Sequence, residues 1–174
     1  MKKILVAESR NDASVLRTLL AAAGVEKVEI FEGGGKSSAM SLGTSFGLQI
    51  DTQVAIVVDA DTTDSNRLQE QKLIFEDLQR RSPGSGICKL FLAVPTLEEE
   101  LFPTAKDFSS AFNLKLTERQ IERYKNDWNL VVRSFLSVPE AGALTTIRTE
   151  GISPVALRRL FEKPLLRDLK AFLS

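Results

Sequence analysis

The sequence predicts an α/β fold: a mainly parallel, four-stranded sheet with helices on both faces, followed by a helical C-terminal extension. Four short runs in the first hundred residues are apolar almost throughout, as strands buried on both faces of a sheet are. Helical patterns separate these runs in the order βαβαβαβ, and parallel strands need such crossovers. From about Pro95 onward the pattern is helical only. We therefore divide the chain into an α/β domain over residues 1–103 and a helical extension over 104–174 packed on it.

The first half of the α/β domain is expected to contain two strands and two helices. Residues 3–7 predict a buried strand, and residues 12–23 carry apolar side chains at helical spacing until Gly24 ends the helix. Residues 28–31 predict the second strand. Residues 37–48 predict a helix, although its two internal glycines disfavour a helical backbone.

The second half of this domain repeats the alternation. Residues 54–58 give the strongest strand signal, because all five are apolar and four are β-branched. Residues 64–81 predict a long helix, and residues 88–94 predict the fourth strand. The positions expected to face inward on the long helix are Leu68, Leu73, Ile74 and Leu78.

Sequence signals for helices also mark the C-terminal extension. A capping-box sequence begins at Thr117, and an apolar stripe at helical spacing follows it. Tyr124 and Trp128 in this stripe could stack on nucleic-acid bases, but such a stripe is more often core. Ser153 followed by a proline provides an N-cap for the last helix, which Pro164 splits or kinks.

The composition excludes several chemistries. With no histidine and one cysteine among 174 residues, the chain cannot build a Ser-His-Asp triad, a Cys-His pair or a His-ligated zinc site. Carboxylate chemistry remains, with or without hard cations such as Mg²⁺ or Mn²⁺ that prefer oxygen ligands. Cys88 cannot form an internal disulfide, and no signal peptide or membrane span is recognisable. We therefore expect a soluble cytoplasmic protein with no membrane partner.

The charge is balanced overall but uneven along the chain. Residues 1–104 hold 11 basic and 15 acidic residues, whereas residues 105–174 hold 12 basic and 8 acidic ones. An acidic half joined to a basic half suits a metal site beside a phosphate-contacting surface, although solvated helix faces explain it equally well. The basic residues that could track a phosphate backbone are Arg158, Arg159, Lys163, Arg167 and Lys170.

Acidic residues follow three of the predicted strands, at the edge where the carboxyl ends of parallel strands meet. They are Glu8 and Asp12 after the first strand, Asp59, Asp61 and Asp64 after the third, and Glu98, Glu99 and Glu100 after the fourth. Like charges at one edge repel one another, and a bound divalent cation relieves that repulsion. We predict a metal site here, while Asp12 and Asp64 are also well placed to cap helices.

The spacing of Asp59 and Asp61 strengthens this prediction. Residues i and i+2 that leave a strand point the same way, so both carboxylates could face one ion. An Asp-x-Asp sequence alone occurs in many loops. Here it follows a buried strand directly, and Glu8 ends another strand of the same predicted sheet.

These two segments resemble the motifs of the Toprim fold. Residues 4–8, with Asp12 four positions on, are similar to its first motif, and residues 55–61 are similar to its Asp-x-Asp motif. Toprim domains occur in topoisomerases, bacterial primases, RecR-type recombination proteins and nucleases of the overcoming-lysogenization-defect (OLD) family. The resemblance covers roughly residues 3–100. It is closest in pattern to the OLD nucleases and to small stand-alone Toprim proteins.

The resemblance implies a role for each acidic residue. It makes Glu8 a general acid/base or a metal-bound carboxylate, and Asp59 and Asp61 the Mg²⁺ ligands. In OLD-like proteins an acidic residue after the fourth strand completes a second metal position, for which Glu98 is favoured over Glu99. Toprim sequences usually have glycine after the motif glutamate, and here that residue is Ser9. This departure leaves metal binding less affected than nucleotide transfer.

Residues 33–38 form a glycine-rich segment with a lysine. The spacing departs from that of a nucleotide-binding P-loop. Gly34, Gly35 and Lys36 could instead cradle a substrate phosphate, with a flexible connection as the alternative.

The function expected is that of a Toprim-type, Mg²⁺- or Mn²⁺-dependent nuclease or phosphotransferase acting on the phosphodiesters of DNA or RNA. Glu8, Asp59 and Asp61 are the expected catalytic residues, and Asp12 and Glu98 join them as metal ligands. A non-catalytic, RecR-like binding module is one alternative. A receiver-type signalling domain with Asp59 as phosphoacceptor is another. A partner ATPase and a homodimer stay open.

Overall fold

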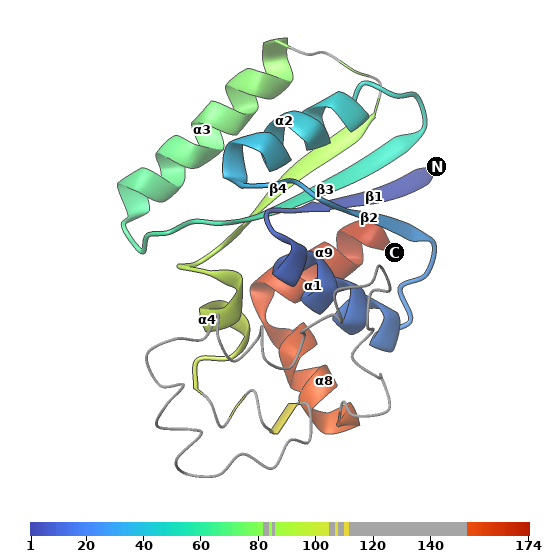
Figure 1. The fold of residues 1–174 in the computed structure, drawn as a ribbon, viewed down its shortest axis with the longest axis vertical. Helices are drawn as coiled ribbons and strands as arrows, with labels where there is room; N and C mark the ends of the chain where they lie inside the picture. The colour runs from blue at the N-terminus through green and yellow to red at the C-terminus, as the bar shows by residue number, and fades with distance from the viewer. Residues whose placement is uncertain (82–83, 85, 105–106, 108–109, 112–152) are drawn as a thin grey trace.

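The fold is a single parallel sheet between two helical layers (Figure 1). The computed structural model describes residues 1–81, 84, 86–104, 107, 110–111 and 153–174. The strands are β1 (Lys2–Ala7), β2 (Val28–Glu32), β3 (Thr52–Asp59) and β4 (Ile87–Ala93). The helices are α1 (Arg10–Ala22), α2 (Lys36–Phe46), α3 (Ser65–Arg81), α4 (Leu97–Leu101), α8 (Pro154–Glu162) and α9 (Pro164–Leu173).

The sheet has the order β2-β1-β3-β4, and all its neighbouring strands are parallel. The four-stranded parallel sheet predicted from the sequence is therefore confirmed. Its register places Ala7 at the end of β1 opposite Val57 of β3 and Glu32 of β2. Asp59 lies opposite Ala93 in the same way. The segments that follow β1, β3 and β4 consequently leave the sheet at one common edge.

The two faces of the sheet are covered by different helices, with α1 and α9 on one face and α2 and α3 on the other (Figure 1). Along β1, Leu5 and Ala7 enter the first core while Ile4 and Val6 enter the second. This alternation explains why the central strands β1 and β3 are apolar over most of their length, since side chains on both of their faces are buried.

The C-terminal helices complete the first of these faces. Pro154 begins α8 and Pro164 begins α9, as expected, so the second proline does split the last helical segment. Leu166 and Leu169 of α9 are fully buried in the core shared with α1 and the sheet. The Gln53 side chain also donates a hydrogen bond to the carbonyl of Phe172. The boundary at residue 103 stays a prediction, and the helix expected from Thr117, with Tyr124 and Trp128, lies outside the described residues.

The inward face of α3 differs from the prediction. Leu73 and Ile74 are 48% and 49% exposed, whereas Phe75 is buried. Phe75 lies seven residues after Leu68 and three before Leu78, and this spacing places all three on one side of a helix. Leu73 lies on the opposite side of the helix, facing away from the sheet.

Gly43 explains how α2 forms despite its glycines. A Cβ atom at Gly43 would collide with the side chain of Ile56 on β3. The missing side chain therefore lets the helix lie close to the sheet, and this packing offsets the low helix propensity of glycine.

Among the described residues, no helix is both long and apolar enough to cross a membrane. The cytoplasmic localisation stays a prediction.

Replacing Leu166 by alanine should lower the free energy of unfolding by about 2 to 5 kcal/mol, because the change leaves a cavity in the core beneath α9. Leu73→Ala is the matched control and should change it by less than about 1 kcal/mol, since this leucine is half exposed. Urea denaturation followed by circular dichroism measures both. Equal losses from the two variants would contradict the assigned core.

Candidate functional site

Glu8 follows β1 and makes hydrogen bonds to β3 and to the glycine segment at the carboxyl edge of the sheet. Its backbone N–H donates to the carbonyl of Val57 at 3.0 Å, and its carbonyl accepts from the N–H of Gly35 at 3.0 Å. Its side-chain Oε2 accepts from the N–H of Asp59, also at 3.0 Å. Burial raises the pKa of the Glu8 carboxyl; the bond from Asp59 and the charge of Lys36 oppose this rise, and the charges of Asp61 and Asp12 add to it. Glu8 thus joins β1, β3 and the glycine segment.

Asp59, the last residue of β3, faces the start of α4. Its Oδ1 accepts a hydrogen bond from the N–H of Leu97 at 2.8 Å. Burial, together with the negative charges of Asp12, Glu98 and Glu8, raises the pKa of Asp59 to about 7, although the bond from Leu97 opposes the rise. Three of the predicted acidic ligands therefore lie close enough to Asp59 to disfavour its ionisation.

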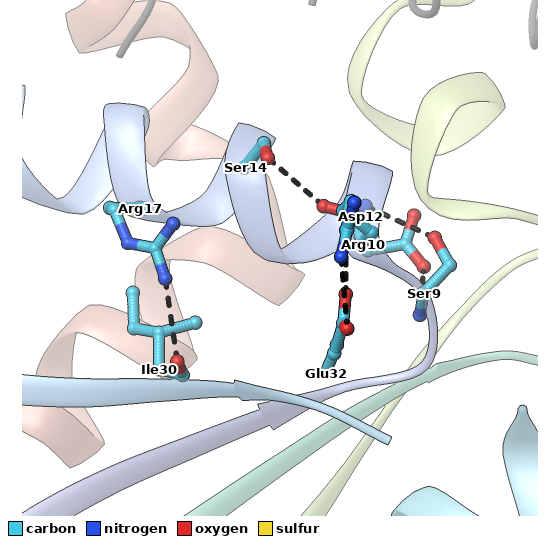
Figure 2. A network of polar contacts seen from close by, with 7 residues as sticks. All are labelled: Ser9, Arg10, Asp12, Ser14, Arg17, Ile30 and Glu32. Atoms are coloured by element: carbon cyan, nitrogen blue, oxygen red, sulfur yellow. Dashed lines mark hydrogen bonds and ion pairs between the residues drawn. The ribbon is translucent and has the colours of Figure 1, made fainter. Parts of the chain in front are cut away.

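Asp12 is held in the capping box of α1 (Figure 2). Its N–H donates to Ser9 Oγ at 3.2 Å, and its Oδ2 accepts from the N–H of Ser9 at 2.9 Å. This pairing accounts for Ser9 where Toprim sequences usually have glycine, because Ser9 is the N-cap of the helix. Beside it, Arg10 pairs with Glu32 of β2. Asp12 is only 5% exposed, and burial raises its pKa.

The cap expected at Asp64 is also present. Its Oδ1 accepts from the backbone N–H groups of Asn66 and Arg67 at 2.9 and 3.0 Å, at the start of α3. Asp12 takes part in a cap as well, but from position N3 of the capping box, because Ser9 is the N-cap of α1. Its role as a metal ligand stays a prediction.

The three glutamates after β4 have different environments. Glu98 is 6% exposed, and burial, followed by the charge of Asp12, raises its pKa. Glu99 is exposed. Glu100 accepts a hydrogen bond from the N–H of Val94 at 2.8 Å through its side chain. The placement therefore favours Glu98 over Glu99 as the acid that belongs with Asp12 and Asp59.

Asp61 is far more exposed than Asp12 and Glu98, since 66% of its side chain is accessible to solvent. Its φ of +54° is left-handed, so the strand geometry that would align it with Asp59 does not continue this far. Its backbone N–H donates to the carbonyl of Pro95 at 2.8 Å. Its Oδ2 pairs with Lys36 Nζ at 2.6 Å, while Asp59 bonds to Leu97. The sequence analysis assumed an extended backbone from Asp59 to Asp61. This assumption is wrong, because the backbone of Asp61 is left-handed.

Gln71 is a site residue that the sequence analysis missed. Its Nε2 donates to the carbonyl of Ala60 at 2.8 Å, between the two aspartates, while Ala60 N–H bonds to the carbonyl of Ala93. Its Oε1 is buried with no hydrogen-bond partner among the described residues. The available signal was a polar residue three positions after Leu68, on the inward side of α3.

The glycine segment is bound to β1. The N–H of Gly33 donates to the carbonyl of Ala7 at 2.8 Å, and Gly35 bonds to Glu8 as described. Gly34 and Gly35 have φ values of +74° and +114°, which glycine adopts without strain. The N–H of Gly35 and the ammonium of Lys36, both expected to hold a substrate phosphate, have acceptors within the chain. No side chain caps the start of α2. The binding of a substrate phosphate by Gly34, Gly35 and Lys36 stays a prediction.

Three of the five basic residues predicted to form a phosphate-binding surface also have internal partners. Lys163 Nζ donates to the carbonyl of Glu100 at 2.7 Å, Arg167 pairs with Asp168, and Lys170 donates to the carbonyl of Ala23. These contacts favour a structural role for this part of the predicted basic surface.

The candidate ligands are of the chemical type that binds a hard cation, but their side chains are not arranged around one point. All candidate ligands are carboxylates, as Mg²⁺ and Mn²⁺ prefer. Within the part of the chain that the structure describes, however, no three acidic side chains are gathered as ligands of one ion. The positive charge at the site comes from a side chain, since the Lys36 ammonium contacts Asp61. Asp12, Asp59 and Glu98 form a buried group whose charges influence one another, and Glu8 interacts both with this group and with the charges of Lys36 and Asp61.

The strand order β2-β1-β3-β4 is that of a doubly wound, parallel α/β sheet. Among solved structures, the chain is similar to the C-terminal region of the Burkholderia pseudomallei OLD protein, with 15% sequence identity and a TM-score of 0.53. The match covers 97% of this chain and 98% of that one. The predicted Toprim-like fold is confirmed by this likeness, which concerns the fold alone. No protein-family model and no curated protein matches the sequence.

Asp59→Asn should stabilise the protein at pH 8 by about 1 to 2 kcal/mol in the absence of divalent cations. The wild-type carboxyl has a pKa of about 7 when folded and 3.8 ordinarily, so its contribution to the unfolding free energy falls as pH rises from 4 to 7. Solvent screening of a half-buried carboxyl reduces the full value of about 1.4 kcal/mol per pKa unit.

Asparagine keeps the oxygen that accepts from Leu97 and never ionises. Urea unfolding at pH 4.5 and at pH 8 with EDTA measures the difference. A variant that is less stable than wild type at pH 8, or a gain that is the same at both pH values, would contradict the assigned environment of Asp59.

Proposed function

We propose that this protein is a Toprim-type, metal-dependent nuclease or related phosphotransferase that acts on nucleic-acid phosphodiesters. The observation that carries the proposal is the position of Glu8, whose carboxylate bonds to the N–H of Asp59. The negative charge of Glu8 also interacts with that of Asp59, in the buried group, and with that of Asp61, in the lysine pair. Such a concentration of carboxylates disfavours the folded state unless positive charge offsets it, which supports a catalytic purpose.

Glu8, Asp59, Asp61 and Glu98 would hold Mg²⁺ or Mn²⁺, and Asp12 would add the oxygen not used in its capping box. Bound divalent cations supply charge neutralisation at the phosphorus and at the oxygens that attack and leave. The resemblance to Toprim sequences assigns the role of general acid/base to Glu8, and the raised pKa of its carboxyl is compatible with that role. The bond from the Asp59 N–H orients Glu8 and leaves its Oε1 for that exchange.

A non-catalytic binding module is the second candidate, and one observation favours it. The Lys36 ammonium neutralises Asp61, and the described carboxylates are not gathered around one point. A domain of this kind would keep the fold and bind nucleic acid or protein without cleaving phosphodiesters.

Glu8→Gln and Asp59→Asn should each lower the rate of metal-dependent cleavage by about 100-fold or more, because each removes a charge from the proposed centre. The assay uses labelled single- and double-stranded DNA and RNA with Mg²⁺, Mn²⁺ or EDTA. Asp64→Asn is the matched control: it removes an acidic charge at the same edge but keeps the oxygen that caps α3.

The control should cleave at the wild-type rate. Cleavage that persists in EDTA, or equal rates for Glu8→Gln and wild type, would refute the proposed centre. Binding of nucleic acid without cleavage under any metal would support the binding module instead.

A further inference from the structure

Lys36 and Asp61 form a short ion pair between the start of α2 and the segment after β3. The two side-chain atoms, Lys36 Nζ and Asp61 Oδ2, are 2.6 Å apart. The Lys36 side chain is only 23% exposed, whereas that of Asp61 is 66% exposed. An ordinary surface pair holds both side chains in water and contributes little to stability. In this pair the lysine side chain is largely covered and its ammonium contacts Asp61, whereas the aspartate side chain remains open to solvent.

Lys36 also directly follows Gly35, whose backbone N–H donates to the carbonyl of Glu8 at 3.0 Å, so the lysine starts beside a second residue of the proposed metal site. An ammonium and a metal ion stabilise the same anionic oxygens, so both cannot occupy the closest position to Asp61 Oδ2 at once.

From this geometry we propose that Lys36 is a built-in competitor of the divalent cation: it occupies the cation's place at Asp61, and metal binding displaces it. The inference rests on the proposed function, because it assumes that Asp61 belongs to a metal site. It goes further by assigning to Lys36 the control of metal affinity.

The backbone allows this exchange without rearrangement of the fold. The residue before Lys36 is fixed by the bond from the Gly35 N–H to the carbonyl of Glu8 and by the bond from Ala39 N–H to the Gly35 carbonyl. Asp61 is fixed by its bond to the carbonyl of Pro95. To move the ammonium away from Asp61, only the side-chain torsions of Lys36 need to change. A lysine side chain has four methylene groups and therefore many rotamers. The open side of Asp61 gives the cation access.

A competitor within the chain lowers the apparent metal affinity by the fraction of molecules in which the site is free. Lys36→Met keeps most of the aliphatic stem and removes the charge, so it should bind Mn²⁺ about tenfold more tightly than wild type. Lys36→Arg keeps the charge and should bind no more tightly than wild type. Lys72→Met removes a positive charge from an exposed residue of α3 and should leave the affinity unchanged.

Mn²⁺ affinity is measured by electron paramagnetic resonance of the free ion, with circular dichroism melting to establish that each variant is folded. Tighter binding by Lys36→Met alone supports the inference. Equal or weaker binding by Lys36→Met, with wild type binding Mn²⁺, overturns it and leaves the proposed function standing. If neither the wild type nor any folded variant binds Mn²⁺, both the inference and the proposed metal site are wrong.

Discussion

The site depends on one hydrogen bond, from the backbone N–H of Asp59 to the side chain of Glu8. This bond joins the ends of β1 and β3, the two central strands of the sheet, and it fixes the Glu8 carboxylate where it can act. The parallel register makes the contact available, because Ala7 lies opposite Val57 and both strands leave the sheet together. The carbonyl of Glu8 then anchors Gly35, which brings Lys36 to the same edge.

The electrostatics follow from this placement. Carboxyl groups that leave water resist ionisation, and several of them together resist it more, so burial is the leading cause of the raised pKa at Asp59, Glu8 and Glu98. The protein compensates in two ways. Backbone N–H groups bond to individual carboxylates, and Lys36 supplies a positive charge at Asp61. These contacts neutralise the negative charge of the carboxylates only in part, so an added cation would stabilise the site further.

The strands and the positions of Glu8 and Asp59 were predictable, since apolar runs identify buried parallel strands and ligands gather at their carboxyl ends. The pair between Lys36 and Asp61 was not, because it depends on a left-handed backbone at Asp61 and on how far a long side chain reaches between two loops. Gln71 was missed for a related reason. Its partner is a backbone carbonyl, and no sequence pattern marks which carbonyl a helix will approach.

The central claim is that the Glu8 carboxylate and its neighbours form a cation site. Its most direct test is a crystal of the protein grown with Mn²⁺ and measured at the manganese absorption edge. The account predicts anomalous density within coordination distance, about 2.0 to 2.3 Å, of carboxylate oxygens of Glu8 and of Asp59 or Asp61, with Lys36 Nζ moved away from Asp61. Manganese bound elsewhere, or no manganese with the Lys36–Asp61 pair intact, would contradict it.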